Sequence, residues 1–457
     1  MEKRTSLHGH WSSRTTFILA VTGSAVGLGN IWKFPYVAGE NGGGAFVLVY
    51  LICVVVIGLP IMMSEVLLGR RGRRNPITTM KVLGEEEAGK SWWQIVGWNG
   101  IIAGFLILSF YSVIGGWSLA YIERSIMGTF VKADGAVVTE TLDSLFASWP
   151  RMLFWHSLFM VMTIVVVAKG VQRGLERAVE VLMPALVVLL IVLLFVSARL
   201  DTFQAGLTFM FEPDFSKLDG DTILVAMGQA FFSLSIGMGA VMAYGAYLPE
   251  GTSIGSTSLI VVFADTMIAM LAGVVIFPIV FNFGLDPAEG PGLVFHSLPL
   301  ALGQLPWSVV LSTAFFVLLT FGAWTSSIGL IEPTVAWLVE RHQLSRPTAA
   351  WLVGGAIWFL GLGTVLSFNV LSDFQFFKGT IFDNLDYLAS NILLPAGGLL
   401  IAIFAGWVMC RNSSAEELDL GTGLRYKVWR FLTRFIAPVG VALVLLNASG
   451  LLAAMRG

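Results

Sequence analysis

Long apolar stretches follow one another along the whole chain, separated by short segments rich in charged residues, glycine and proline. A helix needs about 20 predominantly apolar residues to cross the hydrocarbon core of a bilayer, and most of the stretches reach that length. The pattern predicts an all-α polytopic membrane protein in which residues 1–457 form a single domain. We expect eleven transmembrane helices, at residues 17–39, 44–69, 93–126, 151–169, 178–198, 222–247, 256–284, 305–339, 347–370, 379–410 and 431–454.

The composition agrees with a chain that lies almost wholly in a lipid bilayer. Hydrophobic residues make up 56% of the 457 residues and charged residues only 12%, whereas about 25% of a soluble chain is charged. The net charge of −2 provides no basic surface for nucleic acid. The 2 cysteines and 5 histidines lack the spacing of a disulfide framework or a metal cluster. We therefore expect no nucleic-acid partner and no enzyme.

Lysine and arginine are distributed unevenly between the two sets of connecting segments. With a cytoplasmic N-terminus, 19 of the 27 Lys and Arg residues fall on the cytoplasmic side. The positive-inside rule then predicts a multi-pass protein of the plasma (inner) membrane with its N-terminus in the cytoplasm. An odd number of spans places the C-terminus outside. The segment 285–303 is too short and too rich in Pro and Gly to span, which predicts an external hairpin.

Two of the expected spans are interrupted by helix-breaking residues. The first contains GSAVGLGN at 23–30, and the sixth contains SLSIGMG at 233–239. Small residues also let helices pack closely, but each interruption lies in the first helix of a set of five. That symmetry predicts an inverted repeat, residues 17–198 and 222–410, with an extra helix at 431–454 and a site at the midplane. Freed carbonyl groups there attract a cation, and freed N–H groups attract an anion.

Five motifs, in order along nearly the full chain, carry a family resemblance. They are GSAVGLGNIWKFPY (23–36), ENGGGAFVLVY (40–50), GLPIMMSEVLLGR (58–70), GQAFFSLSIGMGA (228–240) and TSSIGLIEP (325–333). The chain resembles the neurotransmitter:sodium symporter family, and its bacterial amino-acid transporters above all. The resemblance implies the LeuT-type fold of five plus five helices, with helices 1 and 6 broken. It also implies sodium-coupled import of an amino acid by alternating access.

The resemblance further implies two sodium ions, each held by oxygen atoms, the ligands that hard cations prefer. The first ion would bind the substrate carboxylate and oxygen atoms of Ala25, Asn30, Ser233 and an acidic or amide group on helix seven. The second would bind the carbonyl oxygens of Gly23, Val26 and Gly322 and the hydroxyls of Thr325 and Ser326. Hydroxyls within a span commonly bond to the preceding turn instead, which is the alternative for the last two.

Asp265 is an acidic residue inside the predicted seventh span, where an ionisable group is costly and indicates a functional site. We expect it to be the helix-seven ligand of the first sodium ion. Chloride-dependent relatives hold an anion at positions matched here by Tyr50, Gln229 and Ser233. The Asp265 carboxylate would supply that negative charge, so transport is expected to be independent of chloride, unless Asp265 bonds only to helix-end groups. Glu65 is expected to accept a hydrogen bond from the unwound part of helix six.

The resemblance places the amino acid between the two interruptions. The N–H groups of Leu28 and Gly29 and the Tyr111 hydroxyl would hold its carboxylate. Carbonyl oxygens of Ala25 and Phe232, with the Ser326 hydroxyl, would hold its ammonium group. The pocket for its side chain would consist of mostly apolar residues, namely Ser24, Ile107, Phe232, Ser235, Met238, Ser326 and Leu330. This pocket favours a neutral, hydrophobic L-amino acid, and Gly27, which replaces the aspartate of monoamine carriers, disfavours a monoamine.

Three alternatives stay open. Glycine, taurine or a β- or γ-amino acid also suits a small pocket, because one methylene changes discrimination by only about 1–3 kcal/mol. A proton-coupled exchanger of the same architecture would need Lys or Arg at the second sodium site, where this chain has Thr325 and Ser326. A membrane enzyme would need a nucleophile or metal cluster, and the sequence shows no motif for either.

The outer gate departs from the family pattern. Lys33 replaces an arginine on helix one, and a lysine lacks the planar fork that binds a carboxylate with two hydrogen bonds. The acidic partner on helix ten is matched by Gln375, so Asp373 or Asp383 would have to take its place.

The inner gate is matched by Trp11 and Glu340. The arginine that pairs with the acid in many relatives is replaced by His8, so Arg4 or Arg14 is expected to substitute for it.

Overall fold

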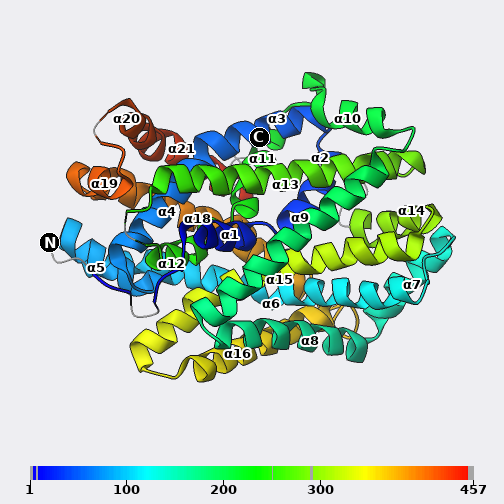
Figure 1. The fold of residues 1–457 in the computed structure, drawn as a ribbon, viewed down its shortest axis with the longest axis horizontal. Coiled ribbons are helices and arrows are strands. Elements are labelled where there is room, and N and C mark those ends of the chain that lie inside the picture. The colour runs from blue at the N-terminus through cyan, green and yellow to red at the C-terminus, as the bar shows by residue number, and fades with distance from the viewer. Residues whose placement is uncertain (1–3, 7–8, 250, 289–291, 422, 451–457) are drawn as a thin grey trace.

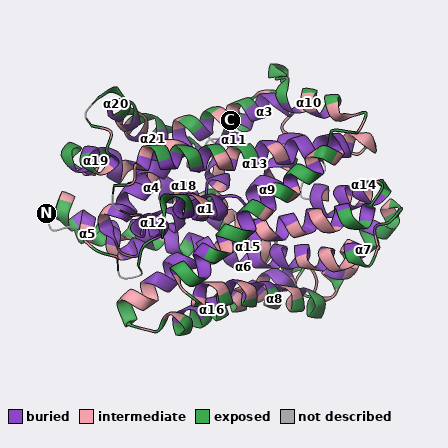
Figure 2. Ribbon diagram, viewed as in Figure 1, coloured by how far each residue is buried: buried purple, intermediate pink, exposed green. Residues whose placement is uncertain are grey.

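The computed structural model describes residues 4–6, 9–249, 251–288, 292–421 and 423–450, and most of these residues are helical. Long helices run side by side along the long axis of the molecule, with short helices at both ends (Figure 1). Buried residues gather in the middle of this bundle and exposed ones along its rim (Figure 2). The outer faces remain apolar, with side chains such as Phe195 and Phe359 about two-thirds exposed, as expected of a surface that meets lipid.

Nine helical segments among the described residues are long and apolar enough to cross a membrane. Several contain a π-helical turn or follow a short 3₁₀ turn. They are α3 (Gly44–Cys53) with α4 (Leu59–Gly72), α6 (Gln94–Ile126), α8 (Trp149–Ala168), η4 (Val171–Glu176) with α9 (Arg177–Ser197), α13 (Ile254–Asn282), α15 (Ser308–His342), α16 (Arg346–Ser367), α17 (Ile381–Asp386) with α18 (Leu394–Ile403) and η8 (Phe404–Val408), and α20 (Leu424–Phe431) with η9 (Leu432–Ile436) and α21 (Ala437–Ala448).

Short helices close the two ends of the bundle. Helices α5 (Pro76–Ala88) and α19 (Arg411–Leu418) lie at one end, and α7 (Gly135–Ala147), α10 (Phe203–Phe211) and α14 (Leu298–Gln304) at the other (Figure 1). The segment expected to form an external hairpin includes α14. Its Pro287 lies so close to Gly39 that a Cβ at Gly39 would be 1.9 Å from the Pro287 carbonyl oxygen. The segment therefore covers one end of the first span.

The first predicted break is present. Helix α1 (Arg14–Ala25) ends where Val26 adopts extended backbone angles, φ −69 and ψ 108. The chain resumes as the π turn η1 (Gly29–Lys33) and helix α2 (Phe34–Glu40), and the two halves are bent by 53°. Counting this bent pair as one span gives up to ten spans in the described residues.

The second predicted break is longer. Helix α11 (Gly220–Ser233) is separated from α12 (Ala240–Ala246) by residues 234–239, which are not helical. Positive φ angles at Ser235 (53°), Gly237 (86°) and Gly239 (74°) turn the chain there. Glycine is required at Gly237, because a Cβ would lie 2.4 Å from the Leu394 carbonyl oxygen. The expected total of eleven spans stays a prediction, since it depends on counting α11 and α12 as one span.

Glu65 bonds to the second break, as predicted. Its carboxylate is fully buried on α4, and Oε1 accepts a hydrogen bond of 2.5 Å from the backbone N–H of Gly237. An unpaired N–H group in the bilayer interior is costly, so this carboxylate stabilises the unwound conformation of residues 234–239.

Replacing Glu65 tests that role. We expect Glu65→Ala to lower the free energy of unfolding by about 1–3 kcal/mol, because it leaves the buried Gly237 N–H without an acceptor. Glu65→Gln keeps a carbonyl acceptor and should lose clearly less. Thermal unfolding in detergent measures both, with exposed Glu140→Ala on α7 as the matched control. Equal melting temperatures for Glu65→Ala and wild type would contradict the assignment.

Candidate functional site

A small cavity lies among four parts of the structure: the two broken helices, helix α6 and helix α15. Its volume is about 20 Å³, which is room for about one water molecule. Nine residues line it, namely Ala25, Gly29, Ile107, Tyr111, Phe232, Ser235, Met238, Ser326 and Leu330. The structure thus brings together every member of the predicted side-chain pocket except Ser24. That side chain faces α15 instead, where its hydroxyl would be 2.0 Å from a Cβ at Gly329.

Polar groups of the cavity bond to one another across it. The Leu28 N–H donates to the Tyr111 hydroxyl at 2.9 Å, and the Ser326 hydroxyl donates to the Val26 carbonyl at 3.2 Å. Gly27 lies between them, and a Cβ there would be 2.3 Å from the Ser326 Oγ and 2.4 Å from the Tyr111 hydroxyl. The cavity is therefore narrow in this conformation, and a larger ligand requires these side chains to move apart.

Asp265 lies directly beside the first break. Its Oδ1 accepts from the Asn30 side chain at 2.8 Å, and its Oδ2 accepts from the Ser233 hydroxyl at 2.6 Å. The Tyr50 hydroxyl lies 3.0 Å from the Ser233 Oγ, and the Gln229 side chain donates to the Gly29 carbonyl at 2.9 Å. These oxygen atoms and one carboxylate, all buried, form a donor set that suits a hard monovalent cation.

The residues predicted for the second ion lie where α1 meets α15. A Cβ at Gly23 would be 3.4 Å from the Thr325 Cβ, and one at Gly322 would be 3.4 Å from the Gly27 Cα. The Thr325 hydroxyl donates to the carbonyls of Phe321 and Gly322 at 3.0 and 3.1 Å, which is the alternative foreseen for it. The Ser326 hydroxyl instead reaches across to Val26 on the broken helix.

The outer gate differs from the prediction. The Lys33 ammonium group lies 4.2 Å from the centre of the Phe232 ring, and no ion pair joins it to a carboxylate in the described ranges. Asp383 caps α17 by accepting from the backbone N–H and hydroxyl of Thr380, both at 2.8 Å. Cation–π attraction thus takes the place of the expected salt bridge and holds the lysine over a residue that lines the cavity.

At the inner end, Trp11 is buried and its indole N–H donates to the Tyr244 carbonyl at 3.1 Å. Glu340 accepts from the backbone and side-chain N–H groups of Asn75 at 2.8 and 2.6 Å. The two arginines proposed as its partner have other contacts. Arg4 pairs with a glutamate of α5, and Arg14 donates to two hydroxyls of α13. His8 lies outside the described residues.

A buried ion pair near this end was missed by the sequence reasoning. Glu332 on α15 is completely buried; it pairs with the guanidinium group of Arg346 and accepts from the Tyr247 hydroxyl at 2.9 Å. Arg346 also donates to the Val167 carbonyl at 2.9 Å. The pair therefore joins α15 and α16 to α8 and to the segment after α12. An acidic residue inside a span, within the TSSIGLIEP motif, was the available signal.

The fold and the site define a membrane transporter built around two broken helices. The chain belongs to the Sodium:neurotransmitter symporter family, which it matches over residues 8–143 and 147–453. It is accordingly a sodium-dependent symporter and a multi-pass membrane protein of a family of transporters.

Relatives of known sequence support this assignment over nearly the full length. A sodium-dependent transporter of Bacillus subtilis, YhdH, is 39% identical over 97% of this chain and 98% of its own. A sodium-dependent transporter of Methanocaldococcus jannaschii is 30% identical over 98% of this chain and 92% of its own. The sodium-dependent dopamine transporter of Bos taurus is 26% identical over 94% of this chain and 67% of its own.

A solved structure is similar throughout. The crystal structure of MhsT in complex with L-phenylalanine has 42% sequence identity and a TM-score of 0.90, covering 96% of this chain and 99% of that one. The predicted fold class, an all-helical membrane protein of the LeuT type, is confirmed by this similarity.

The Glu332–Arg346 pair is open to a direct test. Arg346→Met leaves a buried carboxylate without its counter-charge, which should cost about 3–5 kcal/mol of unfolding free energy. The double variant Glu332→Gln/Arg346→Met removes both charges and should recover most of that loss. Thermal unfolding of the three proteins, with exposed Arg341→Met as control, gives the comparison. A double variant as unstable as the single one would show that the pairing does not matter.

Proposed function

We propose that the protein imports a neutral, hydrophobic L-amino acid together with two sodium ions, independently of chloride, by alternating access. The observation that carries the proposal is the buried Asp265 carboxylate, bonded to both Asn30 and Ser233 beside a cavity lined by apolar and aromatic side chains. The similarity to a transporter solved with L-phenylalanine supports the substrate class.

Recognition of the cargo uses backbone and hydroxyl groups around the cavity. In the open site, the N–H groups of Leu28 and Gly29 and the Tyr111 hydroxyl bind the substrate carboxylate. The carbonyls of Ala25 and Phe232 and the Ser326 hydroxyl bind its ammonium group. The side chain then lies against Ile107, Met238 and Leu330, and the soft thioether of methionine adapts to different apolar shapes.

The space around Gly27 supports an amino acid over a monoamine. A side chain at this position would collide with Tyr111 and Ser326, so the site as built requires glycine there. The first broken helix therefore has no carboxylate at this position to pair with the amine of a monoamine. The charges of an amino acid are instead met by backbone groups and by a sodium ion.

Coupling follows from shared ligands. The first sodium ion binds near Ala25, Asn30, Ser233 and Asp265, and the substrate carboxylate completes its shell, so each stabilises the binding of the other by reciprocal linkage. The second ion, held by Gly23, Val26, Gly322, Thr325 and Ser326, ties α1 to α15. Its loss favours opening at the end where Trp11 and Glu340 lie.

The excess of Lys and Arg supports an orientation in the plasma membrane. The end of the bundle with α5 and α19 faces the cytoplasm, as does the N-terminus, and the end with α7 and α14 faces outward.

Ligand-dependent thermal stability tests sodium coupling and the substrate class together. We expect the standard hydrophobic amino acids to raise the melting temperature in NaCl and in sodium gluconate, but not in KCl, because only the folded, sodium-loaded protein binds them. Taurine, glycine and γ-aminobutyric acid serve as comparisons. Stabilisation in KCl equal to that in NaCl would favour the proton-coupled alternative, and stabilisation by taurine alone would overturn the substrate class.

Asp265→Asn tests the source of the negative charge. Uptake by wild-type proteoliposomes should be the same in NaCl and sodium gluconate. The variant should need about ten-fold more sodium, a loss of about 1.4 kcal/mol, and should regain activity when chloride replaces gluconate. Exposed Asp286→Asn is the control. A chloride requirement in the wild type would refute chloride independence.

A further inference from the structure

A row of basic residues begins the last span and has no part in the proposed transport cycle. Lys427, Arg430 and Arg434 follow one another at intervals of three and four residues along α20 and η9, so they share one face of the helix. We name these three residues the α20 basic stripe. Helix α20 lies at the same end of the bundle as α5 and α19 (Figure 1), the end that faces the cytoplasm in the orientation proposed above.

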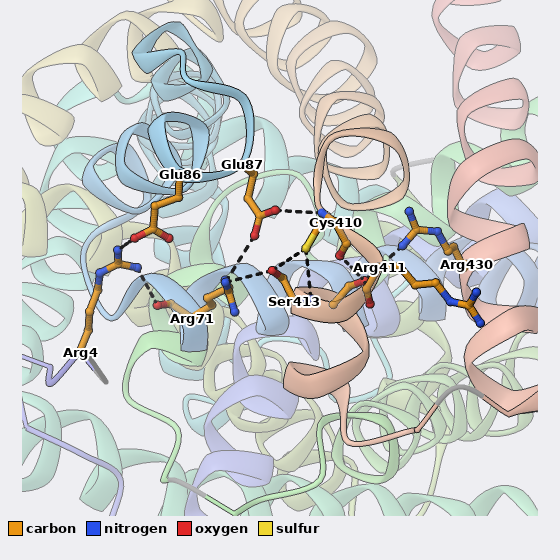
Figure 3. A network of polar contacts seen from close by, with 9 residues as sticks. Arg4, Arg71, Glu86, Glu87, Cys410, Arg411, Ser413 and Arg430 are labelled. Atoms are coloured by element: carbon orange, nitrogen blue, oxygen red, sulfur yellow. Dashed lines mark hydrogen bonds and ion pairs between the residues drawn. The ribbon is translucent and has the colours of Figure 1, made fainter. Parts of the chain in front are cut away.

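Nearby arginines have acidic partners, whereas the stripe has none among the residues that the structure describes. Arg70 pairs with Glu417 at 2.5 Å. Arg71 pairs with Glu87 at 3.4 Å, in a network that reaches Ser413 of α19 (Figure 3). Arg430 donates only to neutral oxygens, at 2.6 Å to the Tyr426 hydroxyl and at longer distances to groups of α19 and the turn before it.

The other two members of the stripe are Lys427 and Arg434. Lys427 is exposed, and the structure gives neither Lys427 nor Arg434 an ion pair within the part of the chain that it describes. The Arg434 Nε atom is buried and has no hydrogen-bond partner. Within the described residues, no carboxylate therefore neutralises these three positive charges, of which Lys427 is exposed and Arg430 and Arg434 are half-buried.

Aromatic residues hold Arg434 at a defined depth. Its guanidinium group lies 3.9 Å from the centre of the Trp407 ring and 5.6 Å from that of Phe435. The Trp407 indole N–H donates to the Arg434 carbonyl at 2.8 Å and fixes the two helices together. Trp407 lies at the end of its span and is 50% exposed, as is typical of the aromatic belt at the level of lipid headgroups.

An apolar face borders the stripe. Leu424, Val428, Phe431 and Phe435 follow intervals of four, three and four residues and are 45–77% exposed. Figure 2 shows the exposed character of α20 at the rim of the bundle. A helix with a lipid-facing apolar side next to a basic side binds anionic membrane surfaces through both features.

We propose that the α20 basic stripe and Trp407 form a binding site for the headgroup of an anionic phospholipid of the inner leaflet. The phosphate bonds to Arg434 and Arg430, Lys427 adds charge from the cytoplasmic side, and the acyl chains lie along Phe431 and Phe435. Arg70 and Arg71 already pair with glutamates, so they do not contribute to the site, which lies on the last two spans.

Lipid retention by the purified full-length protein tests the site. Native mass spectrometry in neutral detergent should show bound phosphatidylglycerol in preference to phosphatidylcholine. Each basic residue contributes about five-fold in affinity, so Lys427→Gln/Arg434→Gln should bind phosphatidylglycerol at least ten-fold more weakly. The control, Arg173→Gln/Arg341→Gln, removes two exposed charges from the same end and should bind as the wild type does. Added KCl at constant NaCl should weaken the preference.

Further outcomes separate the possibilities. Arg434→Lys keeps the charge and the fold, and should bind between wild type and the double variant. Equal retention of both lipids, equal loss in the control, or competition by free glycerol phosphate at similar concentrations would overturn the proposal. Sodium-dependent stabilisation by amino acids, measured on the same samples, reports separately on the transport function and on folding.

Discussion

The structure depends on satisfying backbone groups that two broken helices release in the middle of a membrane. The bilayer core contains no water that could form hydrogen bonds with these groups, so each group needs a partner inside the protein. Side chains provide them at both breaks. The pairs are Gly27 N–H with Asn30, Leu28 N–H with Tyr111, Gly29 carbonyl with Gln229, Val26 carbonyl with Ser326, Ser24 carbonyl with Ser235, and Gly237 N–H with Glu65. Tyr111, Ser235 and Ser326 also line the cavity, and Asn30 also bonds to Asp265, so the constraint and the site share side chains.

Much of the fold could be predicted because its signals are local. Apolar length sets the spans, and clustered glycine and serine mark where Val26 and Gly237 leave helical geometry. The fold class, both breaks and the bond from Glu65 were predicted from the sequence and agree with the structure. The boundaries of the two repeats follow from the symmetry of the breaks and the total of eleven spans from apolar length, and both stay predictions.

The gates were harder to predict because they join residues far apart in the sequence. The resemblance led us to expect an acidic partner for Lys33, yet its ammonium group lies over the Phe232 ring. The Glu332–Arg346 pair crosses from one span to the next and also contacts Tyr247. The pairing can be recognised only once α15, α16 and α8 are packed together. The cost of burying Glu332 nevertheless indicated that this carboxylate needs a partner.

The small volume of the cavity has a consequence for how tightly any ligand is held. A space of about 20 Å³ admits no amino acid, so binding draws on whatever fraction of molecules has opened. The measured dissociation constant is the intrinsic one divided by that fraction. Any change that favours the wider form therefore tightens apparent affinity without touching the cargo, and selectivity among amino acids reflects the free energy of widening the pocket as well as the fit.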